Sequence, residues 1–260
     1  MKTAQKFFVV SASVVFAGLL SAVFFSGHAI SASSGIPVLT YHEIVADGSK
    51  KPGRAILTLT QFQEQMQFLK QNGYQTLSLD ELVQVLQEKK KAPVKPVVIT
   101  LDDGFINALQ ALPILELYGF KASFWIFPGK GLGGVYMDWK SIEALDKNPL
   151  FEVGAHSISH PDLAAWISGR VQGKGEPDVR FELQESKRIL EEHLGHPVRY
   201  FAWPYGKFNE KLIQLARDAG YEALFTTEHG LNYSGQDLMR IHRAVVDGSK
   251  DFGTFKELLK

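Results

Sequence analysis

Two adjacent carboxylates stand at the end of a short apolar run. Residues 97–101 are almost all branched and apolar, which predicts a buried strand, and Asp102, Asp103 and Gly104 follow directly. Burying either aspartate is costly unless it is paired or binds a metal ion. Side chains alternate between the faces of a strand, so the two can act together only if the chain turns, which Gly104 permits. The pattern indicates one carboxylate on a cation and one that moves a proton; an ordinary Asp-Asp-Gly turn is the alternative.

A pair of histidines follows a second predicted strand at residues 151–155. On a helical turn, His156 and His160 would face the same way because they are four residues apart. Neutral imidazole and carboxylate are ligands that suit Zn²⁺ and related ions. With Asp103 they would supply three ligands and leave positions open for water and substrate. A solvent-exposed loop is the alternative for the histidine pair taken alone.

The elements that must position these residues alternate between strands and helices. Residues 78–81 form a capping box that begins one helix, Thr60 is expected to cap another, and residues 107–118 are expected to form a third. Near-continuous apolar strands are predicted at 36–41, 97–101, 122–127, 151–155, 199–203, 223–226 and 241–246. Such strands between helices indicate a parallel sheet, and about seven units predict an α/β fold, an incomplete (β/α) barrel.

Barrel enzymes carry their chemistry at the C-terminal ends of the strands. The polar residues that directly follow the predicted strands are His42, Asp102 with Asp103, His156 with His160, and Tyr205. These residue types at one rim are what a metal-dependent hydrolase needs. The rim therefore predicts catalysis rather than a structural role alone.

Three motifs resemble those of the polysaccharide deacetylases, the NodB-homology carbohydrate esterases. Residues 100–104 and 156–160 look like the first two motifs, residues 201–206 resemble the third, and the likeness runs from about Ile36 to Val246. The resemblance implies a hydrolase that removes N-acetyl groups from an exported or cell-wall glycan containing N-acetylglucosamine. An O-acetyl esterase on the same scaffold and a catalytically silent glycan-binding protein are the alternatives.

The resemblance also implies a role for each site residue. Asp102 would be the general base, and the backbone N–H of Tyr205 would help to stabilise the oxyanion. Pro204 and Tyr205 would border the substrate. Apart from the resemblance, Trp139 follows a glycine-rich loop and is expected to line the cleft, since aromatic side chains stack on sugar rings; core packing is the alternative. One divalent ion, zinc first and cobalt, nickel or manganese as alternatives, would be held by Asp103, His156 and His160.

Two departures from the family pattern point to one subgroup. The third motif usually carries an arginine two residues before its proline, which orients the base; here that position is Ala202, so the partner of Asp102 is unknown. The general acid is either His42 or His242. His42 is favoured because residues 41–44 resemble the N-terminal Tyr-His element of the poly-N-acetylglucosamine deacetylases, which also lack that arginine.

Composition excludes several other classes of function. The 260-residue chain has no cysteine, which excludes disulfides, thiolate metal sites and a cysteine nucleophile. Its 28 basic and 28 acidic residues argue against a nucleic-acid partner. Separately, we expect the protein to be a monomer. Residues 129–134 match a GxGxxG pattern with Glu152 about 20 residues further on, but no helix opens at the third glycine, so dinucleotide binding is not expected.

The N-terminus predicts export. Lys2 and Lys6 precede an uncharged apolar run of about 19 residues, and small residues follow it. Residues 1–34 are therefore expected to be a signal peptide or an N-terminal membrane anchor, and residues 35–260 a NodB-like domain. The protein would be secreted or attached to the outer face of the membrane.

Overall fold

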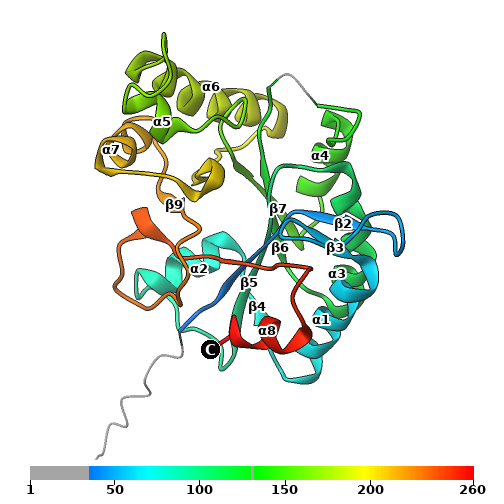
Figure 1. Cartoon of the computed structure of the whole chain (residues 1–260). Coiled ribbons are helices and arrows are strands. Elements are labelled where there is room, and N and C mark those ends of the chain that lie inside the picture. Colours follow the sequence, from blue (N-terminus) through cyan, green and yellow to red (C-terminus); the bar gives the residue numbers. More distant parts are fainter. Residues whose placement is uncertain (1–34, 130–131) are drawn as a thin grey trace, which may run out of the picture. The chain divides into compact units, whose positions relative to one another are not determined.

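The computed structural model describes residues 35–129 and 132–260 (Figure 1). The predicted signal or anchor at 1–34 lies outside the described residues. None of the described helices combines the length and hydrophobicity needed to cross a membrane.

A curled parallel sheet forms the centre of the fold. Its seven strands follow the order β10-β1-β5-β6-β7-β8-β9, and short β4 pairs with β5 beside this path. The predicted incomplete (β/α) barrel of about seven strands is confirmed. The strands of the sheet are β1 (Val38–Tyr41), β4 (Gln75–Thr76), β5 (Pro96–Leu101), β6 (Ala122–Ile126), β7 (Phe151–Ala155), β8 (Tyr200–Ala202), β9 (Ala223–Phe225) and β10 (Ala244–Val245).

The last segment of the sheet spans the gap between β9 and β1. Ile241 bridges Phe225 of β9, whereas Ala244 and Val245 pair with β1. The predicted strand over 241–246 is therefore wrong in extent, because its two ends pair with different neighbours. This crossing brings Arg243, between the two pairings, to the face of the sheet that carries Asp102.

Strand alternation divides the core into two parts. Side chains such as Ile99 and Leu101 of β5 pack with the outer helices, whereas Val98 packs on the opposite face with Trp125 and Phe225. Helix α2 (Leu79–Leu86) covers this second face with its own leucines and valines. Asp102 is four residues after Val98, so its side chain points to the same face of the sheet. Helix α2 covers that face at the opposite end of the strands.

The outer helices pack on the face of the sheet that carries Ile99 and Leu101. Helices α1, α3 and α4 lie beside β5 to β7, and α5, α6 and α7 gather near β8 and β9 (Figure 1). Their bounds are α1 (Leu59–Gln71), α3 (Leu112–Tyr118), α4 (Trp139–Asp146), α5 (Leu163–Ile167), α6 (Glu176–Leu194), α7 (Glu210–Asp218) and α8 (Phe252–Glu257). The sequence patterns missed α5 and α8, as well as β4 and the small sheet of β2 (Glu43–Val45) and β3 (Ile56–Thr58), all of them short.

Helix starts show where local chemistry decides the boundary. The capping box of Ser78 and Glu81 is present as predicted. The predicted cap of α1 at Thr60 is wrong: the Thr58 hydroxyl accepts from the Gln61 amide, and the Gln61 side chain accepts from the Thr58 amide, so the helix begins earlier. The predicted helix over 107–118 is a 3₁₀ turn, η1 (Ile106–Ala111), followed by α3, because Pro113 fits only the first turn of an α-helix.

Candidate active site

Strand register aligns the first site residues. Tyr41 of β1 pairs with Leu101 of β5, and the Asp102 amide donates to the Tyr41 carbonyl at 2.8 Å. His42 and Asp102 are therefore at the same level at the C-terminal ends of neighbouring strands. A cavity of about 520 Å³ opens there, and its lining includes His42, Asp102, Asp103, His156, His160, Trp203, Tyr205 and Lys207.

Asp102 is held by a guanidinium that the sequence motifs did not indicate. Its two carboxylate oxygens accept from Nη1 and Nη2 of Arg243 at 2.8 and 2.9 Å. Arg243 is fully buried, and its Nε donates to the Thr226 carbonyl at 2.8 Å. Burial alone raises the pKa of Asp102, but Arg243, and after it His156 and His42, outweigh this effect and hold the pKa below its ordinary value. The carboxylate is thus ionised and fixed in a two-point geometry.

Asp103, His156 and His160 converge on one point. One ligand atom from each lies within 4.8 Å of the other two. Oδ1 of Asp103 is 3.2 Å from Nε2 of His160 and 3.5 Å from Nε2 of His156. The same oxygen is buried without a hydrogen-bond partner among the described residues. A carboxylate and two imidazoles with an unsatisfied buried oxygen fit a divalent metal ion such as Zn²⁺.

The electrostatics of these residues suit a cation. Burial raises the pKa of Asp103, but the neighbouring His156 ring, and after it His42 and His160, lower it to about 2. Burial, and then the charge of His156, lower the pKa of His160 to about 4, so this ring is neutral near pH 7. Nδ1 of His156 donates a hydrogen bond to the Ala202 carbonyl at 2.7 Å, so in the neutral ring Nε2 has a free lone pair on the side of Asp103.

Backbone strain is concentrated around this cavity. Five described non-glycine residues have a left-handed φ, and four of them belong to the motifs. These are Asp103 (71°), Ser157 (63°), His160 (56°) and Tyr205 (59°). Such conformations cost on the order of 1–3 kcal/mol each and persist where the surroundings enforce them, often at functional sites. The left-handed turn at Asp103 lets it face the same cavity as Asp102 despite strand alternation.

The expected helical turn between the two histidines is wrong. Residues 156–160 contain no helix, and the loop instead turns through the left-handed residues Ser157 and His160. The His160 amide donates to the Ser157 hydroxyl at 3.0 Å. The rings of His156 and His160 still approach, with centroids 4.8 Å apart. Backbone strain, rather than helical spacing, therefore aligns them.

The two candidates for the general acid differ in location. Nδ1 of both rings is buried without a hydrogen-bond partner among the described residues, but His42 belongs to the cavity lining. The lining does not include His242; its amide donates to the Asn232 side chain at 2.9 Å and its ring lies against Gly230. The geometry therefore favours His42 as the group that can reach a substrate.

The residues predicted to contact the substrate also differ in their location relative to the cavity. Tyr205 is 58% exposed at the rim, and its ring lies 4.6 Å from that of His160. Pro204 is buried beneath it in the turn η2 (Pro204–Gly206). Trp139 lies outside the lining: it is the first residue of α4, and its ring stacks on His193 with centroids 3.6 Å apart. This packing accounts for Trp139 without a contact to the cavity.

Arg243 is the main site residue that sequence reasoning missed. Its signal was weak: a charged residue directly before the apolar run 244–246, in a chain where the third motif lacked its expected arginine. The crossing of 241–245 between β9 and β1 places it opposite Asp102. Ala202, at the position of the absent arginine, contributes only its carbonyl, which binds His156.

Similar proteins extend over most of the chain. The family described as polysaccharide deacetylase matches residues 89–224. The protein YxkH of Bacillus subtilis (strain 168), itself named for this family, is 28% identical over 86% of this chain and 77% of its own length. The poly-beta-1,6-N-acetyl-D-glucosamine N-deacetylase of Escherichia coli (strain K12) is 24% identical over 86% of this chain, which spans 38% of that protein.

Solved structures show the same fold. The deacetylase PplD of Streptococcus pyogenes, solved with acetate, superposes with a TM-score of 0.75 at 24% identity and covers 87% of this chain and 98% of its own. IcaB from Ammonifex degensii gives a TM-score of 0.74 at 24% identity and covers 87% and 96%. With the family match spanning more than half of its residues, the chain belongs to the polysaccharide deacetylases, hydrolases that act on carbon–nitrogen bonds other than peptide bonds.

Proposed function

We propose that this protein is a metal-dependent deacetylase of an exported glycan rich in N-acetylglucosamine. One observation carries the proposal: a complete set of metal ligands and a separately held carboxylate face the same cavity. Asp103, His156 and His160 surround one point, while Arg243 keeps Asp102 apart from them. The match with the Escherichia coli N-deacetylase supports the choice of glycan and of the N-acetyl group.

Asp103, His156 and His160 would hold the metal ion. When bound, a divalent cation there supplies Lewis-acid chemistry: it polarises the acetamide carbonyl and makes a water molecule more acidic. The lining leaves one side of this point to the cavity, where substrate and water can enter. Zinc is the first expectation from the ligand types, with cobalt, nickel and manganese as alternatives.

Asp102 would act as the general base. Its lowered pKa keeps the carboxylate ionised, and the bidentate contact with Arg243 aims it. Its Oδ2 lies 3.9 Å from Nε2 of His156, so it borders the metal site without sharing the ligand set. A proton removed from water by Asp102 leaves the nucleophile beside the acetamide carbon.

His42 would protonate the departing amine. An amine leaves poorly unless it receives a proton, and His42 lies beside Asp102 on the neighbouring strand end. The Tyr205 backbone, at the rim next to His160, would donate its N–H to the oxyanion of the tetrahedral species.

Export of the protein follows from the same proposal. A cell-wall or extracellular glycan lies outside the membrane, so residues 1–34 would serve as signal peptide or anchor and residues 35–260 as the catalytic domain. We propose that the domain acts as a monomer, because all the residues assigned to the site come from one chain.

An acetate-release assay tests the proposed reaction. The purified protein, stripped of metal and reloaded with Zn²⁺ or Co²⁺, should release acetate from N-acetylglucosamine oligomers, and Asp102→Asn should not. His196→Gln, at an exposed histidine paired with Asp146, serves as the matched control that keeps full activity. Acetate released only from O-acetylated xylan would support an esterase, and glycan binding without any release would support a silent binding protein.

A further inference from the structure

Helix α6 carries one charged residue on its apolar face. Its buried positions are Val179, Glu182, Leu183, Ser186 and Leu190, which follow the spacing of the helix side that packs on the core. Glu182 is only 5% exposed. Carboxylates are seldom buried without a partner, so this glutamate requires an explanation that the helix itself does not provide.

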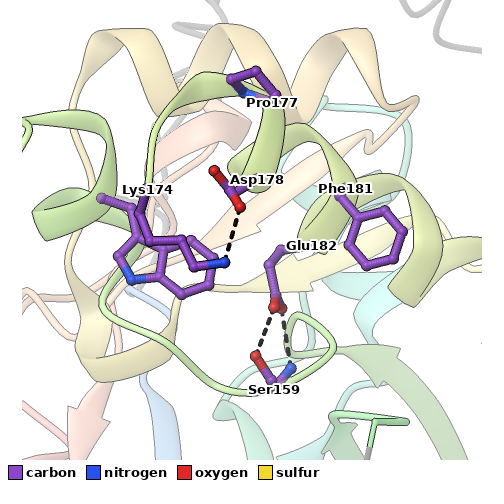
Figure 2. A pocket seen from close by; sticks show the side chains of 7 residues that line it. Ser159, Lys174, Pro177, Asp178, Phe181 and Glu182 are labelled. Carbon is purple, nitrogen blue, oxygen red and sulfur yellow. Dashed lines mark hydrogen bonds and ion pairs between the residues drawn. The ribbon is translucent and has the colours of Figure 1, made fainter. Parts of the chain in front are cut away.

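The partners of Glu182 all belong to the loop between the two metal-site histidines. Its Oε2 accepts from the amides of Ile158 and Ser159 at 2.7 and 3.0 Å, and its Oε1 accepts from the Ser159 hydroxyl at 2.6 Å. Figure 2 shows the side chain reaching down from α6 to Ser159, whereas Lys174 turns to Asp178. Within residues 35–129 and 132–260, no lysine, arginine or histidine forms an ion pair with Glu182.

The loop needs such an acceptor because of its conformation. The left-handed residues Ser157 and His160 flank the two amides, which point in one direction as successive donors around an anion. The other side of the loop is fixed by the Gly129 amide, which donates to the Ile158 carbonyl at 2.9 Å. A side chain on Gly129 would meet that carbonyl oxygen at 2.2 Å, so the loop is confined from both sides.

We infer that Glu182 is a positioning residue for the metal site: by binding the amides of Ile158 and Ser159, it fixes the spacing of His156 and His160. This rests on the proposed function, because it takes the two histidines as ligands. Glu182 does not reach the cavity and touches neither substrate nor metal; it acts through the loop. Losing it would let the strained loop relax and carry His160 away from Asp103.

Metal affinity of the full chain tests this role. Glu182→Leu removes all three acceptor contacts and should weaken Zn²⁺ binding by about 10- to 100-fold in competition with a chromophoric chelator. Glu182→Gln keeps one oxygen for both amides and can donate to the Ser159 hydroxyl, so it should stay within about threefold of wild type. Glu185→Gln, on the same helix but paired with exposed Arg188, is the control and should show no change.

Hydrogen exchange supplies a readout that needs no metal. In Glu182→Leu the amides of residues 158 and 159 should exchange faster, while amides of β5 and β6 keep their protection. If Glu182→Leu does not fold, Glu182→Asp, whose shorter side chain cannot reach both amides, takes its place with the same expectation. A folded variant with unchanged zinc affinity and unchanged loop exchange overturns the inference. Zinc binding by wild type without acetate release overturns only the proposed function.

Discussion

Two partly or fully buried carboxylates on the same face of the sheet differ in what surrounds them. Asp102 follows β5 at the cavity end and is bound by the Arg243 guanidinium. Glu152, at the start of β7, lies toward the opposite end and accepts from the Leu79 amide at 2.5 Å and the Ser123 hydroxyl at 2.7 Å. Asp102 therefore has a cationic partner, whereas the partners of Glu152 are neutral.

The difference in partners gives the two groups opposite pKa shifts. Burial raises the pKa of both. For Asp102 the nearby charges outweigh burial and the pKa falls, whereas for Glu152 the two neutral donors offset only part of it and the pKa rises to about 7. The protein thus keeps an ionised carboxylate at one end of the sheet and a carboxyl that titrates near neutrality at the other. The neighbouring charge, rather than burial, decides which behaviour results.

Of the changes considered, metal removal should have the largest effect. It should act at the cavity end of the sheet and not at the end that carries Glu152. Treatment with a chelator should abolish acetate release, and Zn²⁺ or Co²⁺ should restore it, since three of the cavity residues form the proposed ligand set. The melting temperature of Glu152→Gln should respond to the chelator as wild type does. Full activity after exhaustive chelation would contradict the metal role.

Removing the guanidinium should make Asp102 resemble Glu152. In Arg243→Met, burial acts on Asp102 with less opposition, so its pKa should rise and the acid limb of the activity profile should move to higher pH. We expect kcat/KM to fall by about 10²- to 10³-fold and unfolding free energy by about 3–5 kcal/mol, as for a broken buried pair.

The double variant Arg243→Met with Asp102→Asn separates these two effects. It should recover part of the lost stability in a denaturant titration, because it no longer buries an unpaired charge. It should remain inactive. An Arg243→Met profile with its acid limb at the wild-type pH would show that the guanidinium does not set the pKa of Asp102.

Glu152 should make stability fall with rising pH. Its folded pKa of about 7 lies above the ordinary value of 4.5, so its contribution is complete below pH 4.5 and is lost as pH rises through 7. The loss is at most about 3 kcal/mol for a shift of this size. Glu152→Gln should therefore flatten the stability profile between about pH 5 and 8 in denaturant titrations. The same slope in variant and wild type would contradict this assignment.

An exposed pair near Glu152 should matter least. Arg199 and Asp80 bind each other at 2.5 Å with side chains 40% and 42% exposed. Solvent screens such pairs, so Arg199→Ala should cost less than about 1 kcal/mol and leave activity unchanged. A larger loss in thermal unfolding would mean that the bond from Tyr200 to Asp80 depends on Arg199.

The sequence by itself determined the fold class and indicated the strand ends at which the candidate residues lie. These are local properties: apolar runs, capping boxes and polar residues after strands depend on near neighbours along the chain. Short elements such as α5 and β4 were not predicted, because so few residues do not show a recognisable hydrophobic periodicity. The start of α1 depended on which of two threonines forms a capping box with the glutamine three residues after it.

Only the tertiary structure decided which groups support the site residues. Arg243 is 141 positions from Asp102, and it lies beside Asp102 because residues 241–245 cross from β9 to β1. Glu182 and the loop of His156 and His160 meet through the packing of α6, and the histidines align through left-handed turns that no helical spacing predicts. Charge partners and strained loops depend on contacts between distant segments, and sequence spacing does not encode such contacts.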